Sequence, residues 1–134
     1  MIGAKPFGCV HVVTAGEAAY ANLFCQFNVE YITGQWGPTW EPFVYKPWHV
    51  RLMAMYAEVL NAASVPKRGI PVWLYALWRP SDAYGLASVV QGAQGKAQWQ
   101  GDLMCEHGFG VMVRLPSVIA GDIITIGGSY EPIR

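Results

Sequence analysis

The sequence predicts a mainly β fold, a β-sandwich or small β-barrel of about seven or eight strands with one α-helix near residues 48–64. Three observations support this fold class. Residues 23–31 alternate between apolar and polar side chains, residues 70–79 are apolar on both faces, and 15 Gly and nine Pro are spread along the chain. At 134 residues, the chain has the length of one domain, so we expect a single domain over residues 1–134.

The first strands are expected near the amino terminus. Residues 7–14 favour a strand, and residues 14–17 favour a turn. The next strand has the clearest period of two in the chain, which indicates one buried and one exposed face. Its apolar face would hold Leu23, Cys25, Phe27, Val29 and Tyr31, and its polar face Asn22, Gln26, Asn28 and Glu30, with Phe24 as the exception.

Residues 33–47 are rich in Pro, Gly and Trp, so we expect an ordered connection with at most an edge strand at residues 43–45. Pro47 is suited to the first turn of a helix, and the following residues include many good helix formers. Apolar residues there recur at spacings of three and four, which predicts a largely covered helix that ends before Pro66. These residues are Leu52, Met53, Tyr56, Val59, Leu60 and Ala63.

The sequence of the second half of the chain predicts strands and turns. Residues 70–79 predict a strand covered on both faces, either at the centre of a sandwich or against another subunit. Further strands are expected at residues 86–90, 96–105, 109–115 and 122–126. Turns are expected at residues 80–85, 91–95 and 120–122.

The composition argues against several function classes. Nine basic and nine acidic residues give a net charge of zero, and Lys67-Arg68 is the only adjacent basic pair, so we expect no specific nucleic-acid binding. Apolar runs are too short to span a membrane as a helix. The amino terminus lacks the apolar core of a signal peptide, so we expect cytoplasmic synthesis.

Two short Cys-x-His patterns are the candidate metal ligands. Cys9 with His11, and Cys105 with His107, would each project to one face of a strand, and two such strands side by side would offer a Cys2His2 zinc site. The spacing is not that of a zinc finger, and we expect ordinary reduced cysteines and no cofactor.

Catalytic patterns are weak. Cys105 with His107, or Cys25 with His49, would be a nucleophile and base only if the two side chains met and a third group oriented the base. No motif surrounds these residues, and the glycines match neither phosphate-loop pattern. We therefore expect that the chain is not an enzyme, with a small enzyme as the third alternative.

Tryptophan is the most suggestive residue type, with six in the chain. Trp is enriched at the energetic centres of protein interfaces. Exposed Trp faces also stack on sugar rings, so a carbohydrate-binding module that uses residues 36–48 is the alternative. The predicted interface residues are Trp36, Trp40, Trp48, Trp73 and Trp78.

The low charge favours assembly as the function. Only 13% of the residues are charged, about half the usual share, while 53% are hydrophobic. Apolar faces with little charge repulsion make large subunit interfaces. In composition, the chain resembles small capsid, decoration or tail components of a virus or bacteriophage. We therefore predict a self-assembling structural protein of a virion, with its own copies and other structural subunits as partners.

Overall fold

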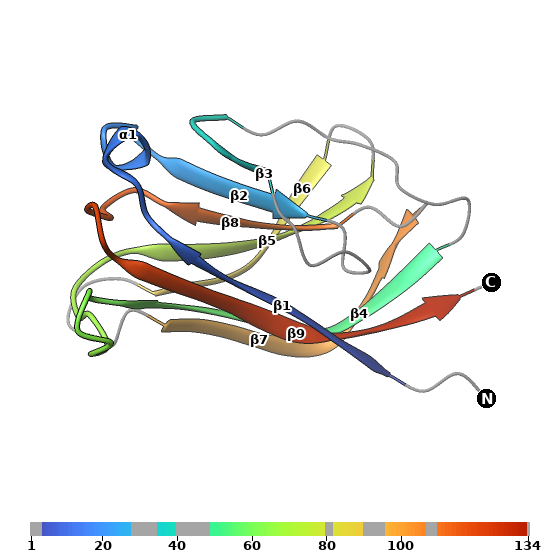
Figure 1. The fold of residues 1–134 in the computed structure, drawn as a ribbon. Helices are drawn as coiled ribbons and strands as arrows, with labels where there is room; N and C mark the ends of the chain where they lie inside the picture. The colour runs from blue at the N-terminus through green and yellow to red at the C-terminus, as the bar shows by residue number, and fades with distance from the viewer. Residues whose placement is uncertain are drawn as a thin grey trace.

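The structure, a computed structural model, describes residues 4–27, 35–39, 49–79, 82–89, 96–106 and 110–133. Within these residues, two sheets face each other as a β-sandwich, which confirms the predicted fold class (Figure 1). The strands are β1 (Lys5–Val12), β2 (Leu23–Phe27), β3 (Gln35–Gly37), β4 (His49–Leu60), β5 (Val72–Arg79), β6 (Asp82–Val89), β7 (Lys96–Cys105), β8 (Val111–Leu115) and β9 (Ile123–Ile133), and the short helix is α1 (Ala15–Ala18).

The strand order places segments from both ends of the chain side by side. The four-stranded sheet has the order β1-β9-β4-β7, and the five-stranded sheet has the order β3-β2-β8-β5-β6. All the paired strands are antiparallel. Because β1 pairs with β9, the beginning of β1 and the end of β9 share one end of the sandwich, and α1 lies at the other end (Figure 1).

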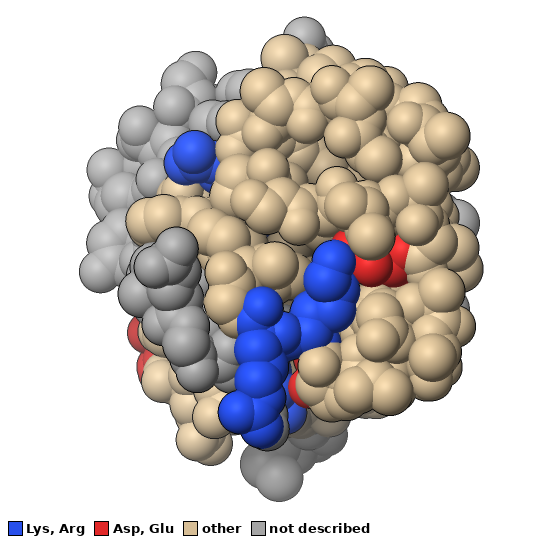
Figure 2. Space-filling model, turned by 90° about the vertical axis from the view of Figure 1, so that its left-hand side faces the viewer, with Lys and Arg blue, Asp and Glu red and all other residues tan. Residues whose placement is uncertain are grey.

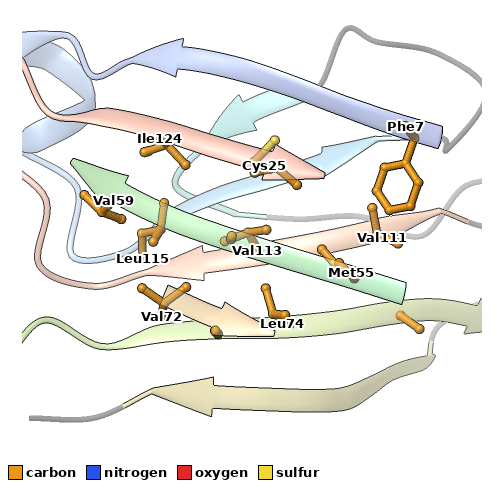
Figure 3. Close-up of a cluster of buried hydrophobic side chains, with 14 of the residues drawn as sticks. Phe7, Cys25, Met55, Val59, Val72, Leu74, Val111, Val113, Leu115 and Ile124 are labelled. Atoms are coloured by element: carbon orange, nitrogen blue, oxygen red, sulfur yellow. The ribbon is translucent and has the colours of Figure 1, made fainter. Parts of the chain in front are cut away.

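The main core fills the space between the two sheets (Figure 3). In the four-stranded sheet, Val59 faces its cross-strand partner Ile124, and in the five-stranded sheet, Leu74 faces Val113. All four side chains are fully buried. Burial of one such side chain contributes about 1.5–3 kcal/mol, so each of these rungs helps to hold the two sheets together.

The prediction of a helix at residues 48–64 is wrong. Residues 49–60 form β4, a central strand that pairs with β9 on one side and with β7 on the other. The remaining residues, 61–64, follow the strand as a turn. Helix propensity is a weak preference that tertiary pairing overrides, and here two neighbouring strands satisfy the backbone of the segment.

A β-bulge explains why β4 resembles a helix in the sequence. The register shifts between Leu52 and Ala54 in the pairing with both neighbours. One extra residue moves the buried side from even to odd positions. The buried residues of the strand are therefore Val50, Leu52, Met55, Ala57 and Val59. The step of three residues from Leu52 to Met55 resembles the spacing of a helix.

The prediction that β5 is covered on both faces is confirmed in part, because Leu77 is buried while Trp73 and Tyr75 are half-buried. Val72 and Leu74 belong to the core between the sheets, whereas Leu77 packs in a second buried cluster with Met112. Gln26, predicted on the exposed face of β2, pairs with Met112 and is only 3% exposed. The chain itself therefore covers this second cluster, and no other subunit is needed to bury it.

Local signals place the turns at the α1 end. The expected turn at residues 14–17 is the start of α1, where the Thr14 hydroxyl accepts a hydrogen bond from the Glu17 N–H, and the Glu17 carboxylate accepts one from the Thr14 N–H. This capping box satisfies two backbone donors at the helix start. The expected turn at residues 120–122 is also present, and Gly121 adopts a φ of +88° there.

Other element boundaries were predicted less evenly. β7 has the predicted bounds, and β8 begins two residues later than predicted. β9 extends seven residues beyond the prediction to Ile133, while β6 begins at Asp82, inside a predicted turn. The edge strand expected at residues 43–45 and the turn expected at residues 91–95 lie outside the described residues.

Candidate functional site

The strand order does not bring together the candidate Cys2His2 zinc ligands. Cys9 and His11 lie on β1, and Cys105 lies at the end of β7, at opposite edges of the same sheet with β9 and β4 between them. Three strand spacings separate these edges by about 14 Å, whereas zinc ligands lie about 2.0–2.3 Å from the metal. His107 lies outside the described residues.

Cys9 meets a different cysteine. The Cys25 thiol donates a hydrogen bond to Cys9 across the interior, from β2 to β1. This bond lowers the pKa of Cys9, although burial acts in the opposite direction. Burial, followed by the neighbouring Cys9, raises the pKa of Cys25 far above its ordinary value. Burial also raises the pKa of Cys105 to about 12.

These pKa shifts bear on the two cysteine nucleophiles considered from sequence. The thiolate is the reactive form of cysteine, and both Cys25 and Cys105 are held as neutral, buried thiols. His49 belongs to β4 in the sheet opposite Cys25. Across the described residues, no group of three or more His, Cys, Asp or Glu side chains is placed to hold a metal ion.

Trp36, a predicted interface residue, packs one face of its ring against another side chain of the same chain. Its ring stacks on the His11 imidazole at a centroid distance of 3.9 Å and an interplanar angle of 14°. His11 Nε2 donates a hydrogen bond of 2.7 Å to Glu17 Oε1. One face of the half-buried Trp36 is therefore occupied by a side chain that α1 holds in position.

The other predicted interface tryptophans divide into two groups. Trp73 is half-buried, with the Arg114 guanidinium 5.6 Å from its ring centre, and Arg114 also donates a hydrogen bond of 2.8 Å to Asn22. Trp78 belongs to β5, but its side chain is not described. Trp40 and Trp48 lie outside the described residues. Of the five predicted interface residues, the structure therefore describes the side chains of Trp36 and Trp73 alone.

The structure shows an apolar surface that sequence reasoning missed. Cross-strand partners on the outer face of the four-stranded sheet place Val12 beside Ile123, and Ile123 beside Leu60. A further bridge joins Leu60 to Pro66. We call these four residues the apolar row. Cross-strand neighbours lie about 4.5–5.5 Å apart, so the row forms one continuous strip across three strands.

The apolar row ends at β1, which is an edge strand of the four-stranded sheet. Within the described residues, the ladder pairings of β1 are with β9 alone. On β1, Val10 is 69% exposed and Val12 is 56% exposed. The strand signal at residues 7–14 was visible in the sequence, but the partners that extend Val12 into a row depend on long-range register.

Few charges surround this end of the molecule. Figure 2 looks onto the α1 end, where uncharged side chains cover most of the described surface, and the visible Lys and Arg side chains lie in a group below the centre and in a separate small patch at the upper left. Lys67 belongs to the turn region after β4 and pairs with Asp122 at 2.8 Å. It is therefore held in an ion pair.

Comparison with known proteins assigns no family. No protein-family model matches the chain, and no curated protein matches its sequence. Among the described residues, no helix has the length and apolar content that crossing a membrane requires.

Solved structures give weak similarities. A chain of the cyanophage Pam1 capsid asymmetric unit is 8% identical with a TM-score of 0.42, covering 99% of this chain and 85% of that chain. A mutant of CBM29-2, a family 29 carbohydrate-binding module, is 10% identical with a TM-score of 0.32 and coverages of 97% and 76%. The xylan-binding module CBM86 from Roseburia intestinalis is 11% identical with a TM-score of 0.35 and coverages of 92% and 96%.

Proposed function

We propose that this chain is a structural protein that assembles with copies of itself, and that it serves as a capsid, decoration or tail subunit of a virus or bacteriophage. The observation that carries the proposal is the position of β1 as the edge strand, among the described strands, beside the apolar row. An edge strand can add a second strand to its sheet, and the row offers apolar area next to it.

Exposure and charge support the same conclusion. The chain exposes 6754 Å², close to the roughly 7,000 Å² expected for a folded monomer of this mass. The chain has only 18 charged residues, nine basic and nine acidic, for a surface of that area. Monomeric proteins protect edge strands with charged side chains and with Pro. In β1, Lys5 and Pro6 stand at the start of the strand, and residues 7–12 contain no Lys, Arg, Asp, Glu or Pro.

The proposed contact pairs β1 with β1 of a second copy. Two antiparallel β1 strands around a twofold axis would extend the four-stranded sheet across both subunits, because a twofold contact uses the same surface on each partner. Val10 and Val12 of each copy would then adjoin at the shared outer face. The proposal assigns no reaction and no cofactor to the chain.

The carbohydrate alternative at residues 36–48 gains no support there. Of that segment, the structure describes residues 36–39, and His11 covers one face of Trp36. The small-enzyme alternative is not supported by Cys25 or Cys105, which are buried and neutral.

Sedimentation velocity tests the proposed assembly. The wild-type protein should sediment as an oligomer or larger particle at micromolar concentration. Val12→Lys should weaken association by about tenfold or more, because it buries a charge at the contact. Met104→Lys is the matched control, since Met104 is an exposed apolar residue on β7, the opposite edge of the same sheet.

The outcomes separate the assembly from a folding defect. Both variants should keep the β-sheet circular dichroism of the wild-type protein. A wild-type protein that stays monomeric at high concentration would contradict the proposal. Equal loss of association in Val12→Lys and Met104→Lys would place the contact elsewhere. Electron microscopy of the assembled protein then tests the virion assignment, which requires closed shells, tubes or binding to viral particles.

A further inference from the structure

A shallow groove of about 430 Å³ opens on the four-stranded sheet, where β4 pairs with β7. It is lined by Ala54, Met55, Tyr56, Gln98, Trp99 and Gln100, and we call it the Tyr56 groove. Its volume falls in the lower part of the range of small-molecule sites. Neither the predicted tryptophan surface nor the apolar row includes any of these residues.

The register between β4 and β7 determines which side chains line the groove. Tyr56 is the direct partner of Gln98, and Ala54 is the direct partner of Gln100. Residues two apart on a strand project to the same face, so these four side chains share the outer face. Ala54 is small, so it leaves a low floor between the Tyr56 ring and the two longer Gln side chains.

A glycine on β9 positions the Tyr56 ring. Gly127 is the partner of Tyr56 on the side away from Gln98. A Cβ atom added at Gly127 would lie 2.6 Å from a ring carbon of Tyr56 and 2.8 Å from its hydroxyl oxygen. The ring therefore rests against the bare backbone of β9. Tyr56 remains 40% exposed, so it is a supported aromatic surface that faces solvent.

The polar groups of the groove are neutral. Gln98 and Gln100 are exposed, and each amide offers two donor hydrogens and an acceptor oxygen. The groove lining contains no Lys, Arg, Asp or Glu. Beside the lining residues, Lys96 Nζ lies over the Tyr56 ring at 5.5 Å from its centre, and the cross-strand partner of Lys96 is Glu58. The lining itself therefore offers an aromatic ring and two neutral amides to a ligand.

We propose that the Tyr56 groove binds a neutral oligosaccharide. The C–H groups on one face of a sugar ring carry a slight positive charge and pack on the negative face of an aromatic ring. The hydroxyl groups at the sugar edge act as both donors and acceptors, as the amides of Gln98 and Gln100 do. Lys96, whose Nζ lies over the ring, supplies a further donor.

A peptide ligand fits this groove less well. Proline-rich peptides dock between aromatic ridges and offer mainly carbonyl acceptors, which would leave the acceptor oxygens of both Gln side chains without donors. The groove is also separate from the apolar row. On β1, Gly8 pairs with Gly127 and Val12 pairs with Ile123. These two positions on β1 are four residues, or about 13 Å, apart.

Titration calorimetry with neutral oligosaccharides tests the site. Hexasaccharides of β-1,4-linked glucose, xylose and mannose are the probes, and a polyproline peptide is the comparison ligand. At least one sugar should bind the wild-type protein with a measurable Kd. Tyr56→Ala should weaken that binding by about tenfold or more. Tyr20→Ala is the matched control, because Tyr20 is 37% exposed and lies after α1, outside the groove.

A second measurement keeps the test independent of folding in Tyr56→Ala. In the wild-type protein, the binding sugar should shift the backbone amide NMR signals of Gly127, Gln98 and Gln100. The double variant Gln98→Ala/Gln100→Ala should also weaken binding while keeping the β-sheet circular dichroism. The proposal is overturned if no sugar binds, if Tyr20→Ala weakens binding as much as Tyr56→Ala, or if only the peptide binds. Retained sugar binding in Val12→Lys separates this site from the proposed self-assembly.

Discussion

Lys67 and Asp122 join two connecting segments that lie 55 residues apart in the chain. Lys67 Nζ donates to Asp122 Oδ2 at 2.8 Å, and the same oxygen accepts a hydrogen bond of 3.0 Å from the Ile119 N–H. The Asp122 carbonyl also accepts from the Val13 N–H at 2.8 Å. With Asp122 only 1% exposed, this ion pair fixes the α1 end of the sandwich beneath the apolar row.

Removal of the Lys67 ammonium should destabilise the fold strongly. Lys67→Met leaves the Asp122 carboxylate buried without its cation, and loss of one partner of a buried pair costs about 3–5 kcal/mol. Lys67 is itself 20% exposed, so we expect a value near the lower limit. Urea unfolding of the wild-type and variant proteins measures this difference.

The double variant Lys67→Met/Asp122→Asn provides the control. The side-chain amide introduced by Asp122→Asn would carry no charge and could still accept from the Ile119 N–H, so the double variant should be more stable than Lys67→Met alone. Arg68→Met, at the exposed neighbouring residue, should change the free energy of unfolding by less than about 0.5 kcal/mol. Equal costs for Lys67→Met and Arg68→Met would show that the ion pair contributes little.

Glu17 should make stability depend on pH. Burial raises its pKa, but the Thr14 N–H and the nearby His11 outweigh burial and lower the pKa overall. A carboxyl group with a lowered folded-state pKa stabilises the fold above its unfolded-state pKa, and this contribution is lost as the pH falls through the folded-state pKa. Glu17→Gln should therefore cost about 1 kcal/mol at neutral pH.

Urea unfolding at neutral and acidic pH checks this prediction. The difference between wild type and Glu17→Gln should shrink as the pH falls, because the wild-type carboxylate becomes protonated. Thr14→Ala is a useful comparison, since it removes the Thr14 hydroxyl acceptor for the Glu17 N–H while the carboxylate stays. A Glu17→Gln difference that is the same at both pH values would mean that the carboxylate charge is not the source of stability.

The strands of the fold were predictable where one local pattern sufficed. β7 has its predicted bounds, and the apolar character of β5 on both faces correctly indicated cover on one side and partial cover on the other. β4 was not predictable in this way, because its bulge after Leu52 changes the buried positions from even to odd. Local spacing alone cannot distinguish that step from a helical repeat.

The candidate surfaces depended on register even more strongly. Val12 and Leu60 are 48 positions apart, and the sequence does not show that Ile123 lies between them. The zinc hypothesis failed for the same reason, since it required β1 and β7 to be neighbours. Trp36 was predicted as an interface residue, and its stacking on His11 follows from the packing of one sheet on the other, which the sequence does not show.

Cys9 should be the most reactive of the three cysteines toward iodoacetamide. It is half-buried, and the hydrogen bond from Cys25 lowers its pKa, whereas burial raises the pKa of both Cys25 and Cys105. Because the thiolate is the nucleophile, native protein should gain one alkyl group at Cys9 first, as peptide mass spectrometry would show. In denaturant, all three cysteines should react at similar rates. Modification of Cys105 before Cys9 in the native protein would contradict the hydrogen bond between Cys9 and Cys25.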